Sequence, residues 1–142
     1  MQKQLKWDLR FLKIAQETSE WSKDPSTKVG AVITNKLKII SCGYNGLPQS
    51  FPDFQSILEN RKEKYKYIIH AEMNAILTAH QDLSGCTLYT FPFLPCTHCA
   101  SMVVQSGITR VVSIKCKKEE WKSRIEESKS FFDLANIEYT EY

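Results

Sequence analysis

The sequence lacks the features that would place the protein in a membrane or in an oxidising compartment. No apolar run among its 142 residues approaches the ~18 residues that are needed to cross a bilayer. The first residues, MQKQLKWDLRFLKIAQE, carry charges throughout and contain no apolar stretch typical of a signal peptide. Five cysteines, an odd number, without such a signal predict reduced thiols rather than disulfides. We therefore expect a cytoplasmic protein with no membrane partner.

An excess of charge of one sign is also missing. The 19 Lys and Arg residues nearly balance the 16 Asp and Glu residues, which leaves a formal net charge of +3. Proteins that bind nucleic acid usually carry a larger basic surface, so we do not expect a nucleic-acid partner. No repeat, low-complexity segment or linker divides the chain, and 142 residues suffice to build one core. The sequence therefore predicts one domain over residues 1–142.

Hydrophobic periodicity predicts an alternation of helices and strands. Helical patterns cover 5–21, 70–81, 117–135 and a segment that follows the PCTHC loop and ends at Gly107. Runs rich in β-branched residues predict strands over 28–35, 36–46, 85–91, 108–114 and 137–142, with the hairpin turn at Asn35-Lys36. The segment 46–66 begins with two prolines and then becomes charged and helical in pattern, as an excursion between two elements. This order predicts an α/β fold, a three-layer α/β/α sandwich with a mixed five-stranded sheet.

Cys96 and Cys99 form a CxxC pair inside the segment LPCTHCA. Positions three apart in the first turn of a helix lie on nearly the same face, so the two thiolates can share one metal ion. Pro95 suits the start of a helix, and the helix dipole stabilises thiolates there. A CxxC pair also fits a redox pair or half of a structural zinc site, so the pair alone does not decide its role.

His70 favours a catalytic metal site. Two cysteines and one histidine are a known ligand set for catalytic zinc, in which the fourth position stays open for water. A structural site would need a fourth protein ligand. His98 lies between the two cysteines, where its geometry is poor, and Cys116 lies in a lysine-rich turn. Cys86 and Cys42 lie in predicted strands, where a buried cysteine usually acts as a small hydrophobic residue.

Glu72 lies two residues after His70, roughly 200° around a regular helix. The two side chains can face one site only if His70 stands at the start of the helix with non-helical dihedral angles. This spacing favours one ligand and one neighbouring base that transfers a proton. The alternative is that Glu72 is a first-turn acid that interacts with the helix dipole.

The combination resembles a known family. A His-x-Glu motif followed by Pro-Cys-x-x-Cys is the pattern of zinc nucleobase deaminases, and here it is HAE at 70–72 and PCTHC at 95–99. The chain resembles the cytidine deaminase superfamily, and most closely the deoxycytidylate (dCMP) deaminases. Further similar segments are KDPSTKVGAVI (23–33), GYNGLP (43–48), HAEMNAI (70–76), GCTLYT (85–90) and SGITRVV (106–112). The long excursion before HAE is also typical of that family, whereas similar tRNA adenosine deaminases have a short connection.

The resemblance implies a cytidine deaminase-like fold and a hydrolytic deaminase. It implies that His70, Cys96 and Cys99 bind one Zn²⁺ per chain and that Glu72 transfers protons. Activated water would attack C4 of the cytosine ring of dCMP, so that ammonia leaves and dUMP, the precursor used for dTTP synthesis, is formed. Some family members bind a second zinc near the excursion, but residues 46–66 contain no cysteine or histidine, so we expect a single zinc.

The resemblance also implies contacts to substrate and to effectors. Asn45 would contact the sugar and base, and Ala71 would offer backbone groups to the pyrimidine edge. Family members are commonly homohexamers, activated by dCTP and inhibited by dTTP, with Mg²⁺ accompanying the triphosphate. The effector residues implied in this chain are Gly43, Tyr44, Asn45 and Gly46. The alternative for GYNGLP is a plain turn, since Asn-Gly and Gly-x-Pro are common in turns.

The phosphate of the substrate has no clear partner in the sequence. We expect Lys28, beside the first turn, and Lys115, after the strand over 108–114, to contact it, because ligands commonly bind at strand carboxyl ends in α/β folds. The alternative for the lysine-rich region is a solvated face with ion pairs such as Glu120 with Arg124.

Two other hypotheses stay open. One is a deaminase of the same chemistry that acts on tRNA adenosine or on a free nucleoside. A tRNA enzyme would need a larger basic surface, and a nucleoside deaminase would usually have a cysteine in place of His70. The other is a non-enzymatic, zinc-stabilised nucleotide-binding module, in which a proton-transferring Glu72 would have no use.

Overall fold

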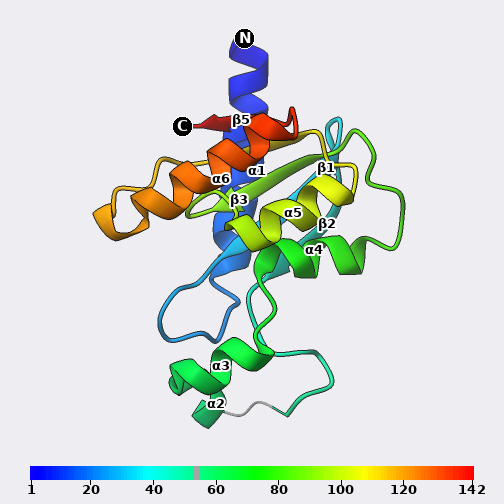
Figure 1. The fold of residues 1–142 in the computed structure, drawn as a ribbon. Helices are drawn as coiled ribbons and strands as arrows, with labels where there is room; N and C mark the ends of the chain where they lie inside the picture. Colours follow the sequence, from blue (N-terminus) through cyan, green and yellow to red (C-terminus); the bar gives the residue numbers. More distant parts are fainter. Residues whose placement is uncertain (53–54) are drawn as a thin grey trace.

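A mixed β-sheet organises the part of the chain that the computed structural model describes, residues 1–52 and 55–142 (Figure 1). Within that part, the sheet has five strands in the spatial order β2-β1-β3-β4-β5. The strands are β1 (Gly30–Asn35), β2 (Lys38–Tyr44), β3 (Thr87–Phe91), β4 (Arg110–Ser113) and β5 (Glu138–Glu141). β1 runs antiparallel to both of its neighbours, whereas β3, β4 and β5 are parallel. The predicted mixed five-stranded sheet is confirmed.

Helices cover both faces of the sheet. Consecutive residues of a strand point to opposite faces, so each strand contributes side chains to both helical layers. Val32 of β1 packs with α1 on one face, while Ala31 and Ile33 pack in the core that includes α4, α5 and α6 on the other. These helices are α1 (Gln2–Ser19), α4 (Ala71–Ala79), α5 (Thr97–Gln105) and α6 (Lys122–Leu134). The predicted three-layer α/β/α sandwich is therefore confirmed. Among the described residues, no helix is both long and apolar enough to cross a membrane.

Several predicted boundaries differ from the observed ones by a few residues, most notably at the hairpin turn and at the start of α6. Asn35 still pairs with Lys38 as the last rung of the hairpin, so the turn consists of Lys36 and Leu37 rather than of Asn35-Lys36. Lys36 adopts a positive φ of 56° there. The predicted helix over 117–135 begins instead with the 3₁₀ turn η1 (Glu119–Trp121), and α6 starts only after it.

The excursion forms a small lobe outside the three layers, at the bottom of Figure 1. It contains α2 (Gln55–Glu59) and α3 (Arg61–Tyr67), which confirms the predicted helical character for these residues. The prediction also covered residues 53–54, which lie outside the described residues. The chain returns to the body where Gly46 and Ile69 exchange backbone hydrogen bonds of 3.1 and 2.8 Å. The lobe is thus anchored directly beside the start of α4.

A buried carboxylate joins α1 to the sheet and to the last residue of the chain. Asp8 is fully buried and accepts hydrogen bonds from Arg110 (2.6 and 2.9 Å), Tyr142 (2.6 Å), Tyr89 (2.8 Å) and Gln4 (2.9 Å). Burial alone would raise the pKa of Asp8. The hydrogen bonds, led by that of Arg110, outweigh burial and lower this pKa from 3.8 to about 2.

This shift predicts a specific acid sensitivity. Because the folded-state pKa of Asp8 lies below its unfolded value, the carboxylate stabilises the fold above about pH 4, and this contribution is lost as pH falls toward about 2. The loss should amount to about 2 kcal/mol of unfolding free energy. We expect Asp8→Asn to be less stable than the wild type at pH 7 in urea unfolding, with a smaller further loss at acid pH. Equal losses in both proteins between neutral and acid pH would contradict this account.

Candidate metal centre and active site

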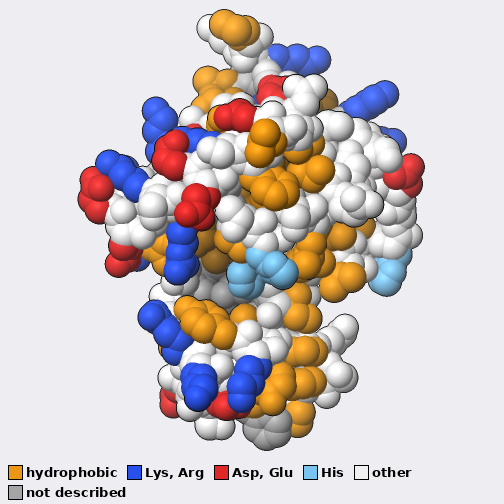
Figure 2. All heavy atoms as spheres, viewed as in Figure 1, with side chains coloured by type: hydrophobic (Ala, Val, Ile, Leu, Met, Phe, Trp, Pro, Cys, Tyr) orange, Lys and Arg blue, Asp and Glu red, His pale blue; other side chains and the backbone are white. Residues whose placement is uncertain are grey.

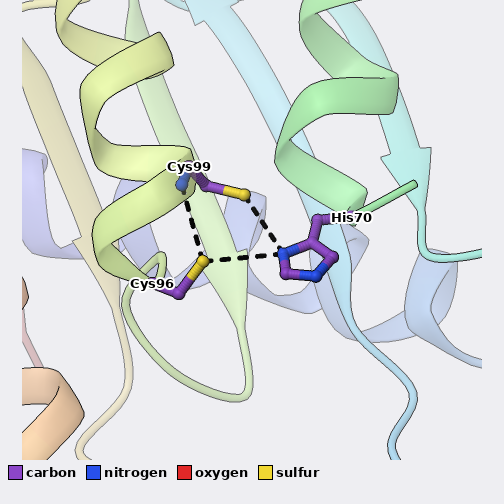
Figure 3. Close-up of side chains that lie close together, drawn as sticks. All are labelled: His70, Cys96 and Cys99. Atoms are coloured by element: carbon purple, nitrogen blue, oxygen red, sulfur yellow. Dashed lines mark hydrogen bonds between the residues drawn. The ribbon is translucent and has the colours of Figure 1, made fainter. Parts of the chain in front are cut away.

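The three predicted metal ligands converge from the starts of two helices (Figure 3). Nδ1 of His70 lies 3.2 Å from Sγ of Cys99 and 3.6 Å from Sγ of Cys96, and all three ligand atoms lie within 4.8 Å of one another. A tetrahedral zinc ion with its usual bond lengths separates a histidine nitrogen from a thiolate sulfur by about 3.6 Å. The donor set and its spacing therefore fit zinc. Within 1–52 and 55–142, no second group of three such residues is close enough to hold a metal.

The backbone at the two helix starts explains this convergence. His70 precedes α4 with φ −69° and ψ 153°, and Cys96 precedes α5 with φ −66° and ψ 166°. Both residues are extended, as predicted for His70, so their side chains project beyond the helix ends instead of lying along them. Cys99 follows in the first turn of α5, and its N–H donates to Sγ of Cys96 at 3.5 Å. Two helix starts therefore present three ligands to one point.

The other candidate ligands lie elsewhere. Cys86 is buried, as expected of a small hydrophobic residue, whereas Cys42 is exposed and the expectation of burial was wrong for it. The reason is that β2 is the edge strand of the sheet, where the neighbouring helices leave this side chain uncovered. His98 is exposed and Cys116 half-buried, and neither belongs to the cluster.

The two thiols of the cluster differ in their protonation, and only Cys96 is polarised toward metal binding. The pKa of Cys96 is lowered to about 3, first because the Cys99 thiol donates a hydrogen bond to it and also because His70 does. The pKa of Cys99 is raised, since this thiol is the donor of the pair and is buried. Thiolate, the form that binds metals, is thus favoured at Cys96 before any metal arrives.

Glu72 lies in the first turn of α4 and is 3% exposed. Burial raises the pKa of Glu72, and the neighbouring His70 opposes this rise. The residue lines the same cavity as His70 and Cys96. A buried carboxyl beside the metal ligands, with a raised affinity for a proton, suits a group that accepts and returns protons.

The cavity beside the metal ligands has a volume of about 450 Å³. Its walls come from the loop before β1, from α3 of the lobe, from the start of α4 and from the region around η1 and α6. Both predicted substrate contacts in this region line it, namely Asn45 and Ala71. A volume of this order accommodates a nucleotide-sized ligand.

Asn45 is held in one orientation by its neighbours. Its Oδ1 accepts from the N–H of Val29 at 2.9 Å, and its Nδ2 donates to the carbonyl of Thr27 at 2.8 Å and to Oδ2 of Asp24 at 3.4 Å. The residue is 7% exposed, and this remaining surface belongs to the cavity wall. The pattern of donors fixes which atom is the amide nitrogen.

The four residues of the GYNG segment have different surroundings. A Cβ added at Gly43 would lie 2.6 Å from backbone atoms of both Ala71 and Ala75, so only glycine allows α4 to approach β2 this closely. Tyr44 is 40% exposed, and its ring packs edge-on against the ring of Trp21. Of the four residues, Asn45 alone lines the described cavity. Gly43 therefore has a packing role, whatever else the segment binds.

The basic residues of the cavity are not those expected from the sequence. Lys28 and Lys115 are exposed and do not line the described cavity, whereas Arg61, Lys64 and Arg124 do. The sequence offers one signal for Arg124. It lies three residues after Trp121, and its guanidinium sits 5.1 Å from the Trp121 ring centroid. Lys64 and Arg61 belong to a charged helix of the excursion, and nothing local distinguishes them from solvated residues.

An aromatic wall was also missed. Phe93 and Trp121 line the cavity, and their ring centroids lie 4.9 Å apart with an interplanar angle of 35°. Ser128 of α6 donates to the carbonyl of Pro95 at 2.6 Å and thereby ties this wall to the loop that carries Cys96. The wall offers an apolar aromatic surface to the cavity that the metal ligands also line.

Comparison with known proteins agrees with this geometry. Residues 5–115 match the family described as the cytidine and deoxycytidylate deaminase zinc-binding region. The chain belongs to this deaminase family. It is 41% identical to an uncharacterized deaminase of Aliivibrio fischeri over 95% of the chain and 92% of that protein. It is 34% identical to the deoxycytidylate deaminase of Mus musculus over 97% of the chain and 80% of that protein. The predicted resemblance to dCMP deaminases is confirmed.

Solved structures share the fold of this family member. The dCMP deaminase of the cyanophage S-TIM5 superimposes with a TM-score of 0.76 at 21% identity and covers 95% of this chain and 96% of its own. The sheet and its covering helices are thus the cytidine deaminase-like fold predicted from the sequence. A zinc-binding family and three residues positioned to bind a metal agree on the nature of the centre.

Proposed function

We propose that this chain is a zinc-dependent deaminase that converts dCMP into dUMP and ammonia. The observation that carries the proposal is the buried Glu72 beside the His70, Cys96 and Cys99 cluster in one nucleotide-sized cavity. The substrate follows from relatives named deoxycytidylate deaminase, such as those of Mus musculus and Homo sapiens at 34% and 33% identity. The long excursion, here α2 and α3, supports the same subgroup.

His70, Cys96 and Cys99 would hold the zinc ion. Zinc supplies the Lewis acidity that makes water a nucleophile near neutral pH. Three protein ligands leave one coordination position for that chemistry, since the described residues offer no fourth ligand in the cluster. Nδ1 of His70 faces both sulfur atoms, which assigns this nitrogen as the ligand atom.

Glu72 moves the protons. Its carboxylate accepts one proton from the attacking water as the new C4–O bond forms and passes it to the ring nitrogen N3; it then takes the second proton from the new C4 hydroxyl and gives it to the departing amino group. The C4–N bond then breaks, ammonia leaves and the C4 carbonyl of dUMP forms. Burial raises the pKa of Glu72, which helps the carboxyl to hold the proton between these two transfers.

The remaining walls orient the nucleotide. Asn45, fixed by Val29 and Thr27, would offer the remaining lone pair of its Oδ1 to the sugar or base, and the backbone of Ala71 would lie beside the pyrimidine edge. Phe93 and the Trp121 ring offer an apolar surface to the planar base. Fixed polar groups and an apolar wall together restrict the base to one orientation.

We place the phosphate contact at Arg124 and Arg61 instead of at Lys28 and Lys115. Both arginines line the cavity, and the guanidinium of Arg124 lies over the ring of Trp121. A guanidinium offers paired donors that match the oxygens of a phosphate. The substrate's phosphate would then lie beside the guanidinium groups of Arg124 and Arg61.

A substrate panel tests the proposal. In an ultraviolet assay across dCMP, CMP, deoxycytidine and dCTP, we expect dCMP to be the best substrate of the zinc-loaded protein. Arg124→Met should raise KM for dCMP about tenfold and leave turnover of deoxycytidine unchanged, because only dCMP carries the contacted phosphate. Preferred deamination of a nucleoside or of tRNA adenosine would contradict the substrate, and zinc binding without any deamination would favour the inactive module.

Regulation is a second part of the proposal. By likeness to the dCMP deaminases, we propose a homohexamer that dCTP with Mg²⁺ activates and dTTP inhibits, through a site that includes Gly43, Tyr44, Asn45 and Gly46. A cytoplasmic location remains a prediction from the sequence. The same panel, repeated with dTTP and with dCTP, should show suppression and relief of dCMP turnover, and rates indifferent to both effectors would remove this part.

A further inference from the structure

A buried ion pair lies in the cavity wall and takes no part in the chemistry above. Nζ of Lys64 lies 3.1 Å from Oδ1 of Asp24, and the two side chains are 6% and 5% exposed. Lys64 belongs to α3 of the lobe, and Asp24 belongs to the loop that precedes β1. Burial of two charges is unfavourable unless they are paired and hydrogen-bonded, and such a pair is a weak source of stability.

Asp24 connects this pair to the substrate site. Its Oδ1 also accepts from the N–H of Ser26 at 2.8 Å, and its Oδ2 accepts from Nδ2 of Asn45 at 3.4 Å. Ser22 reinforces the link, because its hydroxyl donates to the carbonyl of Asn45 at 2.7 Å and accepts from the N–H of Asp24 at 3.2 Å. The carboxylate thus bonds the lobe with one oxygen and Asn45 with the other.

The position of the lobe explains why this connection affects the cavity. α2 and α3 pack against one another outside the three layers, and Figure 1 shows them apart from the sheet. Figure 2 shows the lobe as a separate mass below the body, with Lys and Arg side chains gathered on it. Lys64 and Arg61 of this lobe nevertheless line the cavity together with Asn45. A contact that holds α3 against the loop therefore holds two walls of the cavity at a fixed separation.

We propose that Lys64 and Asp24 are positioning residues that couple the lobe to Asn45 and so set the affinity for the pyrimidine nucleotide. The inference rests on the proposed function, since Asn45 is taken as a substrate contact. Neither residue needs to touch the substrate. Lys64 fixes the distance of α3 from the body, and Asp24 accepts from Nδ2 of Asn45 and so fixes the orientation of this side chain in the cavity wall.

The variant Asp24→Asn tests the positioning role most directly. The oxygen of the new side chain can still accept from Ser26 and Lys64, so the turn and one contact to α3 survive, but the buried Lys64 ammonium loses its counter-charge and the melting temperature should fall. Its NH₂ group then faces Nδ2 of Asn45, and two donors cannot bond one another. We expect KM for dCMP to rise between about tenfold and a hundredfold with a smaller change of kcat, since loss of position affects a bound nucleotide strongly. The dissociation constant of the product dUMP, from equilibrium titration, should rise by the same factor.

Three further variants separate positioning from stability. Lys64→Met leaves the Asp24 carboxylate buried without its partner and should lower the melting temperature as well as raise KM. The double variant Asp24→Asn with Lys64→Met removes both charges, so the melting temperature should return toward the wild-type value while KM stays high. Lys64→Arg keeps a cation at this position and should restore most of the affinity that Lys64→Met loses.

Lys66→Met is the matched control. Lys66 lies in the same helix, is 54% exposed and pairs with Glu63 at 3.1 Å, so its loss should leave KM and dUMP affinity unchanged. An unchanged KM in folded Asp24→Asn, or recovery of KM together with the melting temperature in the double variant, would overturn the positioning role. Wild-type turnover of dCMP in the same assay tests the proposed function separately, because its absence would refute that function and not the coupling of lobe and cavity.

Discussion

Replacing Glu72 with alanine is expected to leave about one zinc ion per chain and to remove nearly all turnover of dCMP. The carboxylate lies beside the metal ligands in the first turn of α4 but outside the ligand cluster. Loss of a general acid–base group typically costs about 10²- to 10⁴-fold in rate. Zinc content is measured by plasma mass spectrometry and turnover by ultraviolet absorbance, both on the same preparation.

The control separates chemistry from folding. Glu17 is an exposed glutamate of α1, on the opposite face of the sheet, and Glu17→Ala should match the wild type in both measurements. Glu72→Gln keeps the shape of the buried side chain and should be as inactive as Glu72→Ala. If Glu72→Ala instead lost zinc together with activity, the glutamate would support the metal or the helix start, and its role in proton transfer would be refuted.

Replacing Cys96 with alanine should remove the metal and, with it, the activity. The ligand set consists of three residues, so loss of one leaves two donors and no tetrahedral frame. Zinc affinity should fall by more than the about 10- to 100-fold that loss of an outer hydrogen bond to a ligand costs. Zinc content after dialysis against a weak chelator, with turnover on the same sample, measures this.

Cys42→Ala supplies the matched control for the cysteine variant. Cys42 is also a free cysteine but is exposed on the edge strand and lies outside the ligand cluster. It should keep both zinc and turnover. Full zinc content in Cys96→Ala would show that the observed cluster is not the metal site, and it would leave the pair Cys96 and Cys99 as a thiol pair of another kind.

The metal ligands could be predicted from the sequence because each lies in a local motif with a geometric consequence. The two-residue spacing of His70 and Glu72 required a non-helical start of α4, and the observed ψ of 153° at His70 meets that requirement. Cys96 and Cys99 share the first turn of α5 for an equally local reason. Runs rich in β-branched residues likewise predicted the strands, because such side chains pack well on a pleated surface that is covered by helices.

The rest of the cavity wall could not be predicted because it depends on contacts between distant segments. Lys64 meets Asp24 across 40 residues of sequence, and in the segment RKEKYKY it resembles a solvated lysine. Arg124 could be assigned to the cavity only once the helix was known to begin at Lys122. Asp8 is a further case, since Arg110, one of its hydrogen-bond partners, is 102 residues away.

The central claim is that this zinc site deaminates dCMP, and product analysis of the zinc-loaded wild-type protein tests it most directly. Incubation with dCMP, followed by chromatography of the nucleotides and enzymatic assay of ammonia, should show one dUMP and one ammonia for each dCMP consumed. Unchanged dCMP in the presence of protein that holds a full complement of zinc would contradict the account.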